Sequence, residues 1–553
     1  MKTGENRGKD KLFNFRPIFF TAVALCLGIF FAFLRVCYGV SLWWLCLLLP
    51  ILGASFCFAL IEKRLFTCTV AWLVMAFAFY LGAISFSVQT DNFQKSEIYN
   101  GEYSVVGKVI EKREFDYSGR ILVDELFIGG ERVKGKLNAY LPLSFYKNVE
   151  LGDEVLLCGT MQTEAEIFDD FGFRSYAIGE NLVYKMNVKD CVVTGEDFDI
   201  FLRIRTRVQS RIYAGMDKDA AAVTMAILTG DTSGMDEGLL ENMRRGGIAH
   251  IFAVSGLHVG ALYAFCLLLL RKTKLKSLPK AGRFCFLAVL LLFYGGICGF
   301  SPSIVRAIIL CLVGYAARLL ASSVDFLETL GLSALIVLCL SPVSLFEVGF
   351  QLSFAACLGI AFFQKGIGQV CVEIGKGYRK RFPRKLTVSQ QKMAQDGDTL
   401  PPTLLERIAR AFVSVLSVTL AVQIATAPIL LANFGYISGW ALLLNVFFVP
   451  IISAAFAFLL LFVVLACLLP SGASAAVLYL PNLLWSLILL LFEAVDFSTF
   501  SLVGWSVSPQ ACICYYGGCL FLTDKFHLSA RWKRIYTLAC FFTFLFLFLE
   551  GNL

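Results

Sequence analysis

The chain has 553 residues, of which 58% are hydrophobic and only 16% are charged, and its formal net charge is +8. A soluble protein of this length needs far more charged surface, so the composition excludes a soluble multidomain protein. Apolar runs of about 16 to 25 residues recur along the chain, as is typical of helices that cross a membrane. We therefore predict a polytopic α-helical membrane protein.

Residues 1–89 are predicted to form the N-terminal membrane helices. Apolar runs lie at 17–36, 39–61 and 65–87. The basic residues before the first run are Lys2, Arg7, Lys9, Lys11 and Arg16. Because Lys and Arg collect on the cytoplasmic side of membrane proteins, we expect a cytoplasmic N-terminus, with the segment after the third run outside.

Residues 90–200 differ in kind, because short alternating and β-branched segments replace the long apolar runs. These segments are 103–112, 120–127, 132–141, 154–163 and 183–193. They predict a small exterior β-barrel, with an OB-like fold as the leading candidate. The region carries 12 Lys and Arg against 21 Asp and Glu, and this net charge of −9 repels a phosphate backbone. A structural or docking module is therefore favoured over a DNA clamp.

Cys158 and Cys191 are the two cysteines of this exterior segment. Thiols outside the cytoplasm form disulfides, so the pair is a disulfide candidate. The alternative is two reduced, buried thiols, because the sequence gives no separation between their Cα atoms.

Residues 201–222 are predicted to form an amphipathic helix at the membrane interface. The apolar stripe is Ile204, Val208 and Ile212, and the basic stripe beside it is Arg203, Arg207 and Arg211. We favour a helix that lies in the interface with its guanidinium groups at the level of the lipid headgroups. The alternative is a stripe that contacts phosphates at the mouth of a channel.

Residues 223–553 are predicted to form a membrane domain with ten further spans, which makes about 13 in the whole chain. The spans are 251–270, 284–300, 303–320, 327–341, 345–363, 412–432, 440–466, 474–495, 508–523 and 535–549. Basic loops at 271–283, 365–410 and 525–534 all fall on the cytoplasmic side in this topology, which agrees with the positive-inside rule.

The stretch 224–262 is the least membrane-like part of this domain. It holds Asp231, His250, Ser255 and His258, and polar groups at membrane depth tend to mark function. A hydrolase built on Asp231, Ser255 and His258 is one interpretation, although the sharp strand-to-helix turn of a nucleophile elbow is missing. The other is that these groups hydrogen-bond to neighbouring helices. Three histidines in the chain are too few for a histidine-rich metal site, so we expect neither metal nor cofactor.

Four blocks in series resemble the family of ComEC-type competence proteins, which are DNA internalization channels. The blocks are LTGDTSGMDEGLLENMRRGGIAHIFAVSGLHVGAL (228–262), GFSPSIVRAII (299–309), SPVSLFEVGFQLSFAACLGI (341–360) and QIATAPILLANFGYISGWALLLNVFFVP (423–450). The N-terminal helices and the barrel, with FDDFGFRSYAIGENL (168–182), also resemble that family.

The resemblance implies transport of single-stranded DNA across the bacterial cytoplasmic membrane during natural transformation. It implies a DNA-delivery receptor outside and an ATP-driven translocase inside, because no Walker A motif occurs in the chain. Many members carry a C-terminal metallo-β-lactamase-like nuclease domain. We do not expect that site here, so a separate nuclease is a further partner. The alternatives are a membrane-embedded hydrolase and a lipid or polymer exporter on the same scaffold.

The resemblance also selects candidate site residues, none of them catalytic. The channel core motif comprises Asp231, Arg244, His250, Ser255, Gly256 and His258, with Gly256 and Gly260 permitting close helix packing. The pore-lining candidates are Arg306, Gln351, Gln423 and Asn445. Ser301 and Pro302 are predicted to begin a helix whose positive end, with Arg306, faces an incoming anion. The alternative for Arg306 is an ion pair with Glu347 that fixes two helices.

Overall fold

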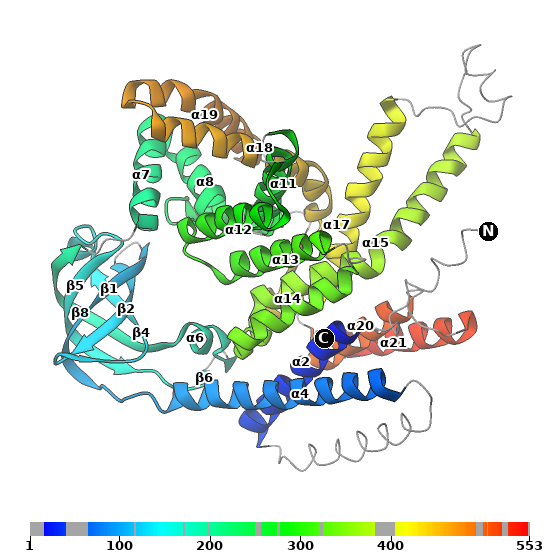
Figure 1. Ribbon diagram of the computed structural model, residues 1–553, viewed down its shortest axis with the longest axis horizontal. Helices are drawn as coiled ribbons and strands as arrows, with labels where there is room; N and C mark the ends of the chain where they lie inside the picture. The colour runs from blue at the N-terminus through cyan, green and yellow to red at the C-terminus, as the bar shows by residue number, and fades with distance from the viewer. Residues whose placement is uncertain are drawn as a thin grey trace.

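The computed structural model describes residues 16–39, 65–115, 118–169, 172–196, 200–248, 256–273, 277–320, 325–381, 404–493, 501–505, 507–522 and 529–550. Figure 1 shows a small β-barrel at one end of the molecule and a helical body from which α15 and α17 project at the other. The predicted span at 39–61 lies outside the described residues except for Gly39, and His250 and Ser255 lie outside them as well.

The barrel closes through five long strands. They are β1 (Gly101–Glu114), β2 (Ser118–Ile128), β4 (Lys136–Pro142), β5 (Asp153–Thr163) and β8 (Leu182–Glu196), with the short β3 (Glu131–Arg132) at the edge. The order is β1-β5-β8-β4-β2, and pairing of β1 with β2 closes the ring. β4 and β8 are parallel, and the other neighbours are antiparallel. This arrangement confirms the predicted small barrel with an OB-like fold.

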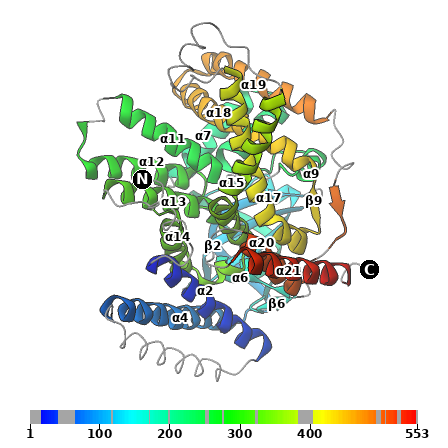
Figure 2. The same ribbon diagram turned by 90° about the vertical axis from the view of Figure 1, so that its right-hand side faces the viewer.

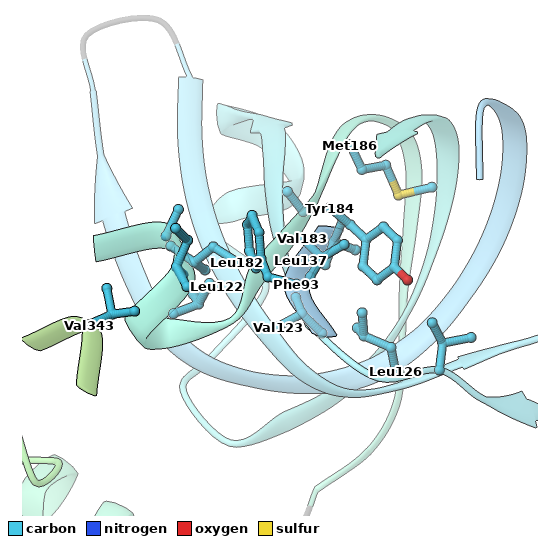
Figure 3. Packing of buried hydrophobic residues seen from close by; sticks show 14 of the residues in the cluster. Phe93, Leu122, Val123, Leu126, Leu137, Leu182, Val183, Tyr184, Met186 and Val343 are labelled. Atoms are coloured by element: carbon cyan, nitrogen blue, oxygen red, sulfur yellow. The ribbon is translucent and has the colours of Figure 1, made fainter. Parts of the chain in front are cut away.

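The barrel has a mainly apolar interior because its strands alternate between buried and outward residues. On β4, Leu137, Ala139 and Leu141 are buried while the residues between them are partly exposed. Figure 3 shows that this core continues beyond the barrel, because Phe93 and Val343 pack in the same cluster. Phe93 belongs to a membrane helix and Val343 to the helical body. The barrel is therefore attached to the body through its own core.

The N-terminal helices α2 (Pro17–Tyr38) and α4 (Leu65–Gln94) pack closely against each other. Two glycines permit the approach: a Cβ on Gly28 would lie 1.9 Å from the Phe79 carbonyl oxygen, and one on Gly82 would lie 2.5 Å from that of Leu25. The Arg16 Nε donates to Asp325 Oδ2 at 2.8 Å, so the start of α2 is tied to the start of α14.

The helical body follows the predicted spans. Its elements are α7 (Ile200–Gly215), α8 (Lys218–Thr229), α9 (Glu237–Arg245), α11 (Gly256–Lys272), α12 (Lys280–Ile297), α13 (Pro302–Leu319), α14 (Phe326–Leu340), the 3₁₀ segment η2 (Pro342–Phe346), α15 (Val348–Arg381), α17 (Leu404–Phe434), α18 (Trp440–Leu468), α19 (Ser471–Glu493), α20 (Pro509–Leu522) and α21 (Ala530–Glu550). Each of the ten later predicted spans overlaps one of these helices.

Eight helices among the described residues are long and apolar enough to cross a membrane. They contain Pro17–Tyr38, Val70–Gln94, Lys280–Ile297, Val348–Glu373, Arg407–Phe434, Trp440–Leu468, Gly472–Leu490 and Arg531–Glu550. The structure supports a multi-pass helical membrane protein with a barrel, but not the predicted count of about 13 spans. α11, α14 and α20 have 17, 15 and 14 residues, fewer than the about 20 that a full crossing needs.

The predicted amphipathic helix at 201–222 is divided between α7 and α8. Ile212 of α7 is fully buried and Val208 packs against the same cluster, so the apolar stripe contacts protein. α8 is buried along nearly its whole length, from Ala220 to Thr229. A helix covered on all sides has no polar stripe, so its sequence carries no amphipathic signal.

A two-stranded ribbon links two distant loops of the body. β9 (Tyr436–Ser438), between α17 and α18, pairs antiparallel with β10 (Ser501–Val503), which follows α19 in the chain. Figure 2 places α9 beside β9. The polar core motif therefore meets the α17–α18 connection.

Candidate functional site

In the part of the chain that the structure describes, two contacts between the barrel and the helical body adjoin the N-terminal end of α13. At the first, the barrel helix α6 (Ser175–Glu180) packs on η2, which leads to Glu347 beside Arg306 of α13. At the second, the start of α7 packs on the turn that precedes α13. The N-terminal end of α13 thus lies between two barrel attachments.

At the first attachment, three other elements hold the main chain of η2. The Val343 N–H donates to Gln89 Oε1 of α4 at 3.2 Å. Ser175 Oγ of α6 donates to the Phe346 carbonyl at 3.4 Å. Gln351 Nε2 of α15 donates to the Leu345 carbonyl at 3.2 Å. Gln351, predicted to line a pore, therefore has a structural hydrogen bond at this junction.

Four phenylalanines from separate elements reinforce the same attachment. The ring of Phe346 lies 4.3 Å from that of Phe33, 5.4 Å from that of Phe173 and 5.7 Å from that of Phe86, between centroids. Phe33 and Phe86 belong to α2 and α4, and Phe173 lies on the short β7 (Gly172–Phe173), which pairs with β6 (Phe168–Asp169). Aromatic contacts in such geometries stabilise beyond the area that they bury.

At the second attachment, Phe201 and Leu202 of α7 reach in opposite directions. Gly152 of the barrel has a φ of 92°, in the region that favours glycine, and a Cβ there would lie 2.1 Å from Leu202 Cδ2. The Phe201 ring packs against Gly296 of α12 and lies 6.5 Å from the ring of Phe300. Phe300 has a φ of 48°, in the turn just before α13.

α13 begins as predicted, with Ser301 at the N-cap and Pro302 at the first position, although the Ser301 side chain makes no capping hydrogen bond. Arg306 lies just over one turn further on and is only 5% exposed. Within the described chain, its Nε has no hydrogen-bond partner. Its Nη2 lies 3.4 Å from where a Cβ on Gly349 would be. A buried guanidinium nitrogen without a hydrogen-bond partner lowers the stability of the fold.

Glu347 is the acidic neighbour of Arg306, but no ion pair within 4.0 Å joins them among the described residues. Instead, Ser344 Oγ donates to Glu347 Oε1 at 3.1 Å. Burial raises the pKa of Glu347, and Ser344 and Arg306 act in the opposite direction. The structure thus places the two residues of the predicted pair near each other, without an ion pair between them among the described residues.

Asp231 of the core motif belongs to a different cluster. Its Oδ2 accepts from Arg205 Nη2 at 3.0 Å, and its Oδ1 accepts from the Ser233 hydroxyl at 2.6 Å and the Ser233 N–H at 3.1 Å. Burial acts to raise the pKa of Asp231, but the bonds from Ser233 and the charge of Arg205 outweigh it and hold the pKa below its ordinary value. This pair ties α7 to the turn after α8.

Arg205 is not among the residues predicted from the sequence. The predicted basic stripe contains the arginines at 203, 207 and 211. Arg205 instead follows Phe201 by four residues and precedes Val208 and Ile212 by three and seven, so it lies on the apolar face. An arginine on the buried face of a helix needs an acidic partner. The spacing of Arg205 relative to the apolar residues is therefore the sequence signal for such a partner.

Arg244 and the end of α9 lie against the α17–α18 connection. The Arg244 side chain is half-exposed and lies 3.6 Å from Glu241, while its carbonyl accepts from Tyr436 Oη at 3.2 Å. A Cβ on Gly247 would lie 2.5 Å from Ala441 Cβ and 3.1 Å from Ser438 Cβ. This glycine therefore permits the core motif to contact the start of α18.

His258 and Gly256 stand at the beginning of α11. His258 is 1% exposed, and its ring lies 5.0 Å from that of Phe456. A Cβ on Gly256 would be in ordinary contact with Ala307 of α13, at 3.7 Å, whereas a Cβ on Gly260 would meet no atom within 4 Å. The close packing predicted at Gly260 is therefore not found.

Gln423 and Asn445 belong to a third group, near β9. Gln423 Nε2 lies 3.5 Å from the Ser438 carbonyl. In the described part of the chain, Ser438 Oγ and Asn445 Oδ1 are buried without a hydrogen-bond partner. The described site residues thus lie in four places: Arg306 and Gln351 near η2, Asp231 beside Arg205, Gly256 and His258 at the start of α11, and Arg244, Gln423 and Asn445 near the β9–α18 segment.

Cys158 and Cys191 are free thiols on adjacent strands. Cys158 lies opposite Asp190, and Cys191 lies opposite Leu157. Because neighbouring residues of a strand point to opposite faces, the two thiols leave different faces of the sheet. A disulfide between them would require another register. The described residues contain no group of three or more His, Cys, Asp or Glu placed to hold a metal ion.

Comparisons with known proteins agree on one family. The model of the Competence protein family matches residues 227–549, more than half of the chain. ComE operon protein 3 of Bacillus subtilis (strain 168) is 25% identical over 233 residues, which are 41% of this chain and 30% of that protein. The match thus spans under a third of that relative's length. No solved structure matches the chain.

Proposed function

This chain belongs to the competence protein family, and from that premise we propose that it carries one strand of DNA across the bacterial cytoplasmic membrane during natural transformation. Family membership and the similarity to ComE operon protein 3 support a role in competence-related DNA uptake. We further propose that the cargo is a single strand, that the membrane is the cytoplasmic membrane, and that the N-terminus lies in the cytoplasm.

The observation that carries the proposal is the environment of Arg306. A strand of DNA carries one negative charge per nucleotide, so its path through a membrane must be wet and polar or cationic. Arg306 is a buried cation whose Nε has no protein partner among the described residues. It stands just inside the positive end of α13, between the two barrel attachments. An anion that passes the barrel would meet this end of the helix first.

The other candidate residues would act along the same path. Gln351, Gln423 and Asn445 would offer neutral hydrogen-bonding groups to the strand. The core motif, from Asp231 to His258 and including Arg244 and Gly256, would shape the path rather than line it, because Asp231 is engaged with Arg205 and Ser233. His250 and Ser255 belong to the same proposed region.

The barrel is proposed as a docking module. Its net charge of −9 opposes close approach of DNA and suits a basic protein that delivers the strand. A receptor outside, an ATP-driven translocase inside and a nuclease on a separate chain complete the proposed set of partners, with membrane lipids around the helices.

The test is uptake of labelled duplex DNA by a strain that lacks the gene and carries a wild-type or a variant copy. Arg306→Gln is expected to lower DNA entry into the cytoplasm about ten-fold, with DNA bound at the cell surface unchanged. Arg318→Gln is the matched control, because it makes the same change at an exposed position of the same helix.

The amount of each variant in the membrane must equal that of the wild type. Wild-type uptake by a normally expressed Arg306→Gln protein would contradict the proposed role of Arg306. Equal uptake in the deletion strain and the complemented strain would reject DNA transport altogether.

A further inference from the structure

Glu347 lies between the barrel and Arg306. On the body side, its carboxylate acts electrostatically on Arg306 but makes no ion pair within 4.0 Å in the described chain. On the barrel side, a Cβ on Gly179 of α6 would lie 2.7 Å from Glu347 Oε1. The carboxylate is therefore packed directly against the barrel helix.

α6 is firmly part of the barrel. Lys136 Nζ of β4 pairs with Glu180 Oε2 at 2.7 Å, and the Lys136 N–H donates to the Asn181 carbonyl at 2.8 Å. Ala177 and Ile178 are buried in the cluster that includes the barrel core. Any displacement of the barrel relative to the body must move α6 as well.

The connection from α6 to Glu347 is short and local. Ser175 Oγ bonds the Phe346 carbonyl, and Gly179 packs on the Glu347 carboxylate. Glu347 itself is held by one hydrogen bond from Ser344 Oγ. Within the described chain, this carboxylate has one side-chain hydrogen bond and no ion pair, so little rearrangement is needed to change its position.

We infer that Glu347 is the counter-charge through which the barrel regulates the anion site at Arg306. With α6 on η2, the carboxylate offsets the guanidinium and weakens its attraction for a phosphate. Because Gly179 belongs to the barrel helix and Glu347 to the body, a shift of α6 on η2 changes the position of the carboxylate relative to Arg306 and so changes how far the guanidinium charge is offset. Glu347 thus acts through Arg306 as a positioning residue. This inference rests on the proposed role of Arg306 as a contact for DNA.

The test measures binding of a fluorescent oligonucleotide of twenty thymidines to the purified full-length protein in lipid nanodiscs, over a range of salt concentrations. Glu347→Gln is expected to tighten binding by about three- to ten-fold, because one opposing charge is lost. The slope of log affinity against log salt should steepen by about 0.7, which corresponds to one more neutralised phosphate of a single strand. Adding Arg306→Gln to this variant should remove both gains.

Gly179→Ala tests the part played by the barrel without changing any charge. The added methyl group displaces the carboxylate, so binding should tighten in the same direction as in Glu347→Gln, by a smaller factor. Glu154→Gln and Gly195→Ala are the matched controls. A Cβ on Gly195 would lie 3.2 Å from Glu154 Oε2, at the end of β8 remote from α6. Both controls should bind like the wild type.

Glu347→Asp guards against a purely structural effect, because it keeps the charge and should keep the wild-type salt slope. A Glu347→Gln protein with wild-type affinity and salt slope would overturn the inference.

The remaining outcomes separate this inference from the proposed function. If Arg306→Gln still weakened binding, the proposed function would stand. If Gly179→Ala bound like the wild type while Glu347→Gln bound more tightly, the barrel would be excluded as the regulator. If Arg306→Gln changed neither binding nor uptake, the proposed role of Arg306 would fail first.

Discussion

The barrel and the rest of the chain differ in net charge and in whether their buried polar side chains are hydrogen-bonded. Of the 49 Lys and Arg and the 41 Asp and Glu in the chain, residues 90–200 hold 12 and 21, which leaves 37 and 20 elsewhere. Among the described residues, buried side-chain atoms without a hydrogen-bond partner include Arg205 Nε, Arg306 Nε, Ser438 Oγ and Asn445 Oδ1. All four lie in the body, and no described barrel residue has such an atom.

The difference shows where stability and where function are concentrated. A closed barrel with an apolar core satisfies its main chain through strand pairing, and most of its charges lie on the surface, with Asp153 as a buried exception. The body keeps incompletely bonded polar atoms at depth, which costs stability and is expected of a path for a polar cargo. Among the described residues, the two parts meet at η2, at the start of α7 and through Phe93 of α4, so these contacts are the places where a change in one part can affect the other.

The largest expected effect is in the barrel core. Leu137→Ala should lower the free energy of unfolding of the barrel by about 2 to 5 kcal/mol, because Leu137 is fully buried and its removal leaves a cavity. Thermal unfolding of the full-length protein in nanodiscs measures the change. Val192→Ala is the control, at a half-exposed position of β8. Equal losses for both variants would contradict the dry core.

The next effect concerns the ion pair in the body. Asp231→Asn should destabilise the protein by about 2 kcal/mol, less than for a fully buried pair because both side chains are partly exposed. Arg205→Gln should cost about as much, and the double variant should cost little more than either. Additive losses would show that the two side chains do not interact.

The same pair has a defined pH dependence. The pKa of Asp231 is lowered by folding, so its contribution is present above the unfolded pKa near the ordinary value of 3.8 and is lost as the pH falls through the lower folded value. The difference in unfolding temperature between wild type and Asp231→Asn should therefore shrink only below about pH 4. A difference that vanished near neutral pH would rule out this linkage.

A smaller effect is expected for the exposed pairs of α9. Glu241 lies 3.2 Å from Arg245 and 3.6 Å from Arg244, and all three side chains are about half-exposed. Solvent screening limits such pairs, so Glu241→Gln should change stability by less than about 0.5 kcal/mol. A loss of stability as large as that of Asp231→Asn would contradict the expectation that the exposed pairs of Glu241 are weaker than the partly buried pair of Asp231.

The smallest effect is expected from reduction. Because Cys158 and Cys191 leave opposite faces of the sheet, a reducing agent should leave the unfolding temperature of the barrel unchanged. A fall of several degrees, with loss of a crosslinked peptide in mass analysis, would show that the sequence-based disulfide forms in another register.

The sequence predicted the elements well where one periodicity applied along a whole segment. The strands of the barrel alternate over their length, and the apolar spans from 284 onward each overlap a helix. The sequence did not mark α8 as a separate element, because a helix that is buried on all sides shows no polar face. It also did not mark Arg205, because the more regular stripe lies on the exposed side of α7.

The sequence by itself determined the class of the molecule, the barrel and the helical spans, because hydrophobicity and residue alternation are local properties. The tertiary structure alone decided which polar groups meet. Arg205 and Asp231 are 26 residues apart, and Gly179 and Glu347 are separated by far more of the chain. Such contacts depend on how helices and strands pack, because packing selects one set of long-range neighbours from the many that the same local pattern permits.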